Sequence, residues 1–190
     1  MASFTLLGEP LAIDLVNTLK TAHTPALDQL DADGAVEAFW AFEATRGTAQ
    51  GEPPLAPLEA EETRGLRALA GRMLAAIRAG EAPDAADLAE ANRLLAAAPT
   101  RVELVAGDTG LAARTPSPAD GTVDGTRAAV LRSLLDAADA ARAGRLRACA
   151  ADDCDQLFVA TNAKRRWCTP EGCGNRARVA RFAARARVSA

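Results

Sequence analysis

Tyrosine is absent from this 190-residue chain, and aromatic residues supply only 4% of it. The apolar residues are mostly Ala and Leu, a composition that favours helices over a strand-rich sandwich or barrel. No run of 18 or more apolar residues occurs, so we expect neither a transmembrane helix nor a membrane partner. The first residues lack the basic segment of a secretion signal, which predicts a cytoplasmic protein whose thiols stay reduced.

Apolar spacing predicts five helices in the first 144 residues, bounded by Pro, Gly or polar capping residues. A β-hairpin is expected where residues 101–106 and 111–115 flank a Gly-Asp-Thr-Gly turn. A polar loop is expected up to residue 32. The predicted helices cover residues 11–19, 33–46, 58–79, 84–95 and 123–143.

Helical spacing also predicts which side chains enter the core. In residues 33–46, the expected buried stripe is Val36, Phe39, Trp40 and Glu43. In residues 123–143 it is Val130, Leu131, Leu134, Leu135 and Ala138. Residues 1–144 therefore form one helical domain with a single core and one small hairpin. Its flat Ala/Leu helix faces favour a homodimer formed through this domain.

Charge is unevenly distributed along the chain. Residues 142–190 contain eleven Lys and Arg against four acids, a formal charge of +7 that leaves −10 for the rest. This asymmetry indicates a basic C-terminal module that contacts an anion. Only two lysines occur, Lys20 and Lys164, so the preference for Arg is global and does not by itself indicate bidentate recognition.

All four cysteines lie in the basic module, with the spacing C-x4-C-x13-C-x4-C. Two close pairs separated by a loop suit a tetrahedral metal site, and four thiolates leave no open position for a catalytic water. We therefore predict one structural Zn²⁺, while disulfides, inert thiols and iron remain as alternatives. The expected ligands are Cys149, Cys154, Cys168 and Cys173.

The residues between and after the cysteine pairs predict the shape of the module. Residues 157–159 are strand-prone, 161–163 favour a turn, and 165–167 lead back to the second pair, which predicts a hairpin between the two knuckles. A helix follows the last cysteine, as in a treble clef. The fold class is thus α+β and mainly α, with a helical domain at 1–144 and a treble-clef-like zinc module at 145–190.

Two segments carry a family resemblance. Cys173-Gly174-Asn175-Arg176, preceded by Arg165-Arg166-Trp167-Cys168, resembles the CGNR zinc finger family, and Leu11-Ala12-Ile13-Asp14-Leu15-Val16-Asn17-Thr18-Leu19 resembles the opening of its N-terminal partner, the ABATE domain. The resemblance implies a stress-induced transcription regulator. It also implies that the four cysteines bind zinc and that the C-terminal arginines contact DNA.

The last helix carries a candidate nucleic-acid face. At 100° per residue, Arg178, Arg181 and Arg185 share one side of it. Arg165 and Arg166 on the preceding hairpin would extend this face to DNA phosphates. The alternative is an ordinary solvated face. Three further residues are expected to support the module, namely Asn175 at the helix start, Arg176 as a brace and Trp167 in its core.

The chain contains no P-loop, G-x-S-x-G, H-E-x-x-H or G-x-G-x-x-G motif, so we do not expect an enzyme. The expected function is weakly sequence-selective DNA binding in transcription regulation. Two alternatives stay open. The basic module could meet an acidic protein, or the helical domain could sense a small ligand.

Overall fold

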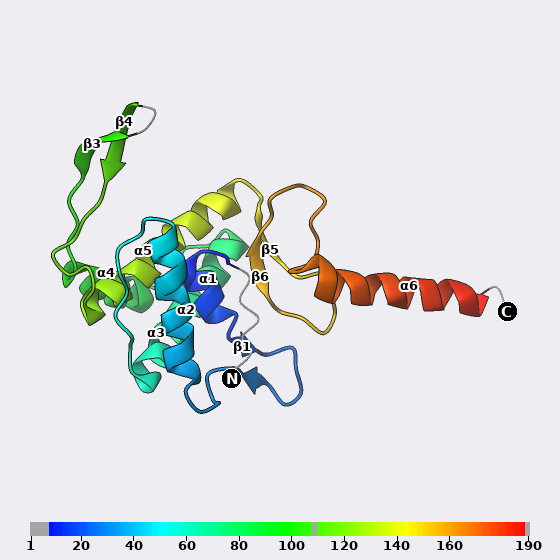
Figure 1. The fold of residues 1–190 in the computed structure, drawn as a ribbon. Coiled ribbons are helices and arrows are strands. Elements are labelled where there is room, and N and C mark those ends of the chain that lie inside the picture. Colours follow the sequence, from blue (N-terminus) through cyan, green and yellow to red (C-terminus); the bar gives the residue numbers. More distant parts are fainter. Residues whose placement is uncertain (1–7, 108–109, 189–190) are drawn as a thin grey trace.

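The computed structural model describes residues 8–107 and 110–188. Figure 1 shows a helical body from which a long hairpin and the last helix project in different directions. The elements are, in chain order, α1 (Leu11–Val16), β1 (Leu19–Lys20), β2 (Leu27–Asp28), α2 (Ala35–Ala49), α3 (Ala60–Ala79), α4 (Ala85–Ala96), β3 (Glu103–Gly107), β4 (Gly110–Arg114), α5 (Val123–Arg142), β5 (Leu146–Ala148), β6 (Leu157–Val159), the π-helical turn η1 (Pro170–Gly174) and α6 (Asn175–Val188).

The five helices expected in the body are present, and side-chain caps mark the starts of two of them. The Asp84 carboxylate accepts a hydrogen bond from the Ala86 N–H at the start of α4, and the Thr122 hydroxyl accepts one from the Gly125 N–H at the start of α5. These bonds satisfy N–H groups that have no partner within the helix. The mainly helical fold class is confirmed.

The predicted extent of the first helix was wrong. The helix ends at Val16 rather than at residue 19, because the Thr18 hydroxyl donates to the Leu15 carbonyl and the chain then turns into β1. Leu19 and Lys20 pair with Asp28 and Leu27 in a short antiparallel ladder. The segment expected to be a polar loop therefore contains two short strands.

The body has one core, in which α1 packs against α3 and α5. The stripe predicted for α2 is confirmed, since Val36, Phe39, Trp40 and Glu43 are all buried. The Trp40 indole N–H donates to the Thr63 hydroxyl and so keeps a hydrogen bond inside the core. In α5 the prediction fails at Leu135, which is 68% exposed.

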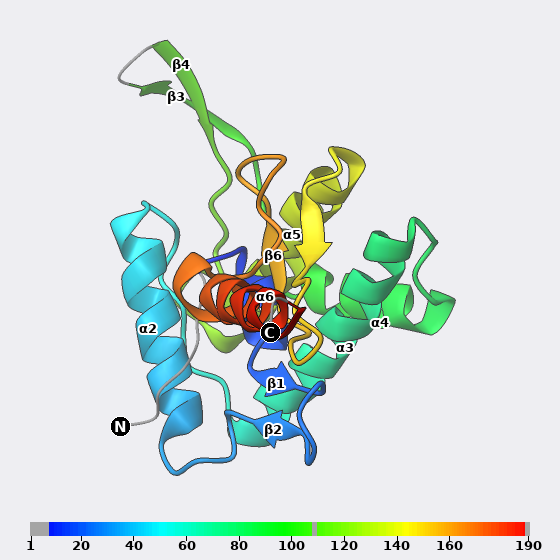
Figure 2. The same cartoon turned by 90° about the vertical axis from the view of Figure 1, so that its right-hand side faces the viewer.

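The expected hairpin between α4 and α5 is confirmed. Strands β3 and β4 pair antiparallel in a register that runs from Glu103↔Arg114 to Gly107↔Gly110. Both views show this hairpin standing away from the helices (Figures 1 and 2).

The C-terminal hairpin differs from the predicted one. Residues 157–159 form β6 as expected, but β6 pairs with β5 at 146–148 and not with residues 165–167. The hairpin therefore encloses the first cysteine pair instead of linking the two pairs. The physical reason lies in the core, because Leu146 of β5 and Leu157 of β6 are buried together beneath the helical body.

The C-terminal module is thus attached to the body through its hairpin, while α6 points away from the body in Figure 1 and toward the viewer in Figure 2. Among the described helices, none combines the length and apolar character that crossing a bilayer requires.

Candidate metal centre

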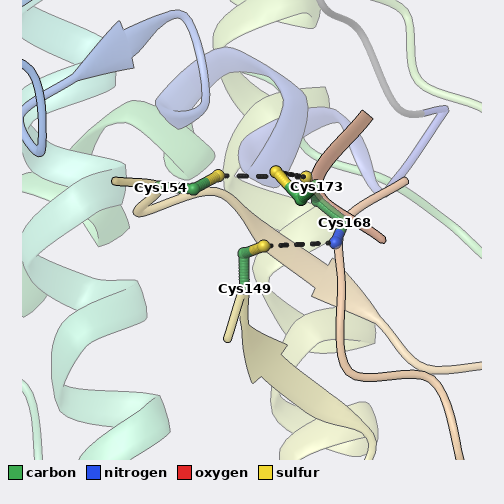
Figure 3. A group of neighbouring side chains, drawn as sticks. All are labelled: Cys149, Cys154, Cys168 and Cys173. Carbon is green, nitrogen blue, oxygen red and sulfur yellow. Dashed lines mark hydrogen bonds between the residues drawn. The ribbon is translucent and has the colours of Figure 1, made fainter. Parts of the chain in front are cut away.

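The four cysteine sulfurs form one compact cluster and lie within 4.8 Å of one another (Figure 3). The Cys168 sulfur is 3.9 Å from that of Cys154 and 3.5 Å from that of Cys173. Sulfurs bound at about 2.3 Å to one tetrahedral Zn²⁺ stand about 3.8 Å apart, so the cluster fits one ion. All four cysteines are free thiols, which excludes the disulfide alternative in this structure.

Two turns place the ligands. After β5, the chain folds back so that the Cys149 N–H donates to the Gln156 carbonyl and the Cys154 N–H donates to the Ala151 carbonyl. This knuckle presents Cys149 and Cys154 from one side. On the other side, Cys168 ends the returning loop and Cys173 lies in η1. The four ligands therefore come from two local turns, as the paired spacing predicted.

The electrostatics of the cluster call for a cation. Burial raises the pKa of the Cys154 and Cys168 thiols, and neighbouring sulfurs raise it further, to about 12 for Cys168. Burial acts in the same direction on Cys149, but N–H groups of Cys168 and Ala151 hold its pKa below the ordinary value. Four adjacent thiols ionise together only around a positive ion, which is the chemistry of thiolate-bound zinc.

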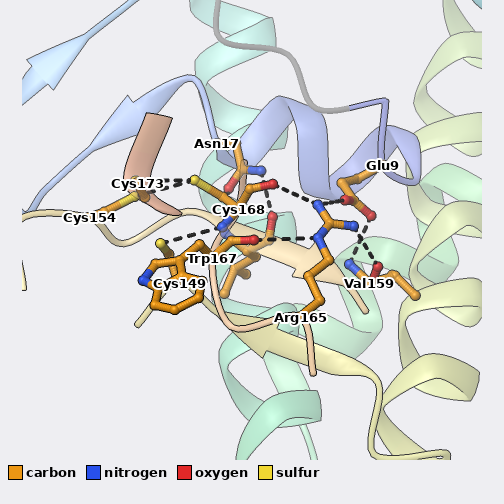
Figure 4. Close-up of polar contacts among 10 residues, drawn as sticks. Glu9, Asn17, Cys149, Cys154, Val159, Arg165, Trp167, Cys168 and Cys173 are labelled. Carbon is orange, nitrogen blue, oxygen red and sulfur yellow. Dashed lines mark hydrogen bonds and ion pairs between the residues drawn. The ribbon is translucent and has the colours of Figure 1, made fainter. Parts of the chain in front are cut away.

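Arg165 joins the cluster to the body (Figure 4). Its guanidinium donates to the backbone carbonyls of Val159, at 3.1 Å, and Cys168, at 2.7 Å, and forms a 3.2 Å ion pair with Glu9. The other Glu9 oxygen accepts from the Val159 N–H at 2.8 Å. Arg165 was predicted to contact nucleic acid, but these contacts occupy it inside the protein, where its side chain is 21% exposed.

A second buried contact comes from α1. The Asn17 side chain accepts from the Leu157 N–H at 2.8 Å and donates to the Leu157 carbonyl at 2.9 Å. The Asn17 carbonyl also accepts from the Gln156 side chain at 2.9 Å. The knuckle is therefore fixed to the helical body by polar contacts as well as by apolar packing.

The donor set, the distances and the knuckle-and-helix arrangement are those of a zinc-binding module. Residues 145–186 match the family model of the CGNR zinc finger. No curated protein sequence matches the chain. The zinc finger thus accounts for the C-terminal module, and its four cysteines form the site of one structural Zn²⁺.

Of the three residues predicted to support the zinc finger, two contact the cysteine cluster and one does not make its predicted hydrogen bond. The Arg176 guanidinium donates to the Cys173 sulfur at 3.2 Å and to Asp153 at 3.0 Å, as expected for a brace. Trp167 packs partly buried against the cysteine cluster. The helix-start hydrogen bond predicted for Asn175 is made instead by Thr169, whose hydroxyl accepts from the Gly172 N–H, and Asn175 itself is exposed.

A cleft of about 520 Å³ opens beside the zinc finger, between the 161–167 loop and α6. Trp167 lines it, and the guanidinium carbons of Arg166 and Arg181 lie 5.6 and 5.8 Å from the centre of the Trp167 ring. Such distances allow cation–π attraction. The described lining contains no acidic residue, and its outward-facing cations are Lys164, Arg166, Arg178 and Arg181.

The structure brings most of the predicted arginine face together. Arg178 donates to the Pro170 carbonyl at 3.2 Å and stays exposed, while Arg185 is exposed farther along α6. Lys164 was missed by sequence reasoning, although its position beside Arg165 and Arg166 was a signal. Glu9 and Asn17 gave no such signal, because they lie more than 130 residues from their partners.

Proposed function

We propose that the zinc finger binds nucleic acid and that the cleft beside Trp167 holds part of the phosphate backbone. The observation that supports this most strongly is the gathering of four cations, Lys164, Arg166, Arg178 and Arg181, in one cleft without an acidic residue among its described lining. Arginine and lysine are the side chains that phosphate oxygens recruit. A role in transcription regulation is the biological part of this proposal.

The pairing of charges elsewhere supports the same interpretation. On the helical body, several exposed arginines have acidic partners, as in Arg72 with Asp87 at 2.7 Å and Arg93 with Glu90 at 2.7 Å. None of the four cations in the cleft forms an ion pair with a carboxylate of the described residues. A cationic surface that the protein does not neutralise itself is suited to an external anion.

The position of α6 makes this surface accessible. The helix projects away from a body whose first 141 residues carry a formal charge of −10, and the cleft lies where the 161–167 loop meets the first turns of this helix (Figure 1). A nucleic acid approaching α6 would meet the basic face first. Contacts of this kind bind the backbone and give weak sequence selectivity.

The test is a salt titration of the zinc-loaded full chain with a labelled DNA duplex, read by fluorescence anisotropy. Three to four phosphate contacts predict that log K falls against log salt with a slope of about −3 to −4. Arg181→Ala should make this slope shallower by about one and weaken binding to all sequences alike. Arg93→Ala is the matched control, because Arg93 is an exposed helical arginine on the body.

The two tryptophans provide a second readout. Trp40 is buried at 1% exposure, whereas Trp167 lines the cleft. DNA binding should therefore change the intrinsic fluorescence of the wild type but not that of Trp167→Phe. Absence of binding at about 50 mM salt by the zinc-loaded protein would reject the proposal. If the protein bound an acidic protein but not DNA under the same conditions, the cleft would be assigned to a protein partner instead.

A further inference from the structure

Helix α6 leaves the zinc finger with most of its surface uncovered. It begins two residues after the zinc ligand Cys173 and projects from the rest of the molecule in both views (Figures 1 and 2). From residue 178 onward, every side chain that the structure describes on this helix is exposed. The metal site therefore fixes one end of a helix whose outer turns are open to a partner.

The exposed part of α6 combines apolar and basic side chains. Val179 is 60% exposed and Phe182 is 77% exposed, and residues three apart lie on the same side of a helix. We call these two residues the apolar strip. Phe182 lies four residues after Arg178, about 40° around the helix from it, so the apolar strip adjoins the arginine face of Arg178, Arg181 and Arg185.

We propose, building on the nucleic-acid binding proposed above, that α6 enters the major groove of duplex DNA and places the apolar strip against thymine methyl groups. The major groove is about 12 Å wide and admits one α-helix, whose diameter with its side chains is about 10–12 Å. The thymine methyl is the apolar group that A·T pairs present in this groove, and apolar side chains recognise it by contact.

The arginine face would then reach the phosphates along one edge of the groove. Arg178 and Arg181 also line the cleft beside Trp167, so a backbone held in the cleft continues directly along α6. Arg185 extends this face by about two helical turns, or about 10 Å, beyond Arg178. The arginines would position the helix and supply affinity, while the apolar strip would supply a modest preference among bases.

Charge and groove shape distinguish duplex DNA from other partners. A second copy of this chain would bring together two helices that each carry five arginines and no acidic residue, so their charges would repel. Double-stranded RNA has a deep, narrow major groove that side chains cannot read. A single DNA duplex would cover the cleft, the arginine face and the apolar strip together, because these surfaces adjoin one another.

The experiment compares two DNA duplexes of about 24 base pairs and the same A·T-rich sequence, one of which carries uracil in place of every thymine. They differ only in the methyl group that thymine presents in the major groove. In anisotropy titrations of the zinc-loaded full chain, burial of one methyl against the apolar strip should make the thymine duplex bind about fourfold more tightly. The salt slope should be equal for both duplexes, because the methyl carries no charge.

Variants separate the apolar strip from the arginine face. Phe182→Ala should bring the ratio of the two affinities close to one and leave the salt slope unchanged. Arg181→Ala should do the reverse, with a shallower slope and a retained preference for thymine. Phe42→Ala is the matched control, because Phe42 is 47% exposed on α2 of the body, and it should change neither quantity. Helical circular dichroism and zinc content equal to wild type would show that the variants are folded.

The outcomes distinguish this proposal from DNA binding itself. Equal affinity for both duplexes with the expected salt slope would leave DNA binding in place and overturn the position of α6 in the groove. A preference for thymine that Phe182→Ala retains would overturn it as well, and so would an RNA duplex of the same sequence that binds as tightly as the DNA. Absence of binding to either DNA duplex at about 50 mM salt would reject both proposals.

Discussion

Asn17→Ala tests how the zinc finger is held on the helical body. The side chain of Asn17 is buried, at 2% residue exposure, and makes both hydrogen bonds to the backbone of Leu157. Truncation leaves the Leu157 N–H and carbonyl unpaired in a site that is itself only 8% exposed. An unsatisfied buried group costs about 1–3 kcal/mol, so the variant should lose about 3 kcal/mol of unfolding free energy.

The assay is thermal and urea unfolding of the zinc-loaded protein. For a chain of this size, a loss of about 3 kcal/mol corresponds to a melting temperature lower by about 6–12 °C. Asn92→Ala is the control, because Asn92 is exposed on α4 and should change stability by no more than about 0.5 kcal/mol. If Asn17→Ala behaved like Asn92→Ala, the reasoning about the buried attachment would be refuted.

Three further predictions concern packing, metal binding and acid stability. Gly125→Ala should destabilise the protein by more than about 2 kcal/mol, because the added Cβ would lie 2.0 Å from the backbone oxygen of Ala119. Gly65→Ala is the opposite case: its Cβ would have open space, so the substitution should stabilise α3 by about 0.5–1 kcal/mol. Urea unfolding measures both changes. Burial raises the pKa of the Cys168 thiol to about 12, so this thiol must lose a proton when it binds zinc. Zinc binding should therefore release protons and weaken as the pH falls. Calorimetry in buffers of different ionisation enthalpy measures the number of protons released. The hydrogen bond from Arg67 lowers the pKa of Asp28, so this pair stabilises the fold above the unfolded pKa of about 3.9 and is lost as the pH falls through the lower folded value. Asp28→Asn should therefore destabilise the protein at pH 7 and have a shrinking effect in acid unfolding below about pH 4.

Local patterns in the sequence predicted the helices and much of the core. The stripe of α2 was identified down to Glu43, a carboxylate whose burial is offset by the neighbouring Arg46, with which it forms a 2.5 Å ion pair. Helical spacing succeeded here because one face of the helix is fully covered. Helical spacing failed at Leu135 because it shows which way a side chain points around the helix but not how far the neighbouring helices extend to cover it.

The cysteine spacing predicted the ligands, and the nearest strand-prone residues suggested the wrong hairpin. Pairing between β5 and β6 depends on Leu146 and Leu157 entering a core that is formed by distant helices. No local rule contains that information. The sequence showed where the strands are but not which of them meet.

The arginines of the zinc finger show a second limit. Arg165 and Arg166 are neighbours with the same chemistry, yet Arg165 is occupied by Glu9 and three backbone carbonyls while Arg166 lies beside Trp167 at the cleft. The distinction depends on Glu9, which lies 156 residues earlier in the chain. Sequence reasoning identified the basic module but not the division of its arginines between internal bracing and an exposed surface.

The central claim is that four thiolates hold one zinc ion at the base of α6. X-ray absorption at the zinc edge of the purified full chain, together with elemental analysis, tests it most directly. The account predicts one zinc per chain with four sulfur ligands at about 2.3 Å and no nitrogen or oxygen neighbour in the coordination sphere. A light-atom ligand, or a chain that stays folded with Cys149, Cys154, Cys168 and Cys173 free and no zinc bound, would contradict it.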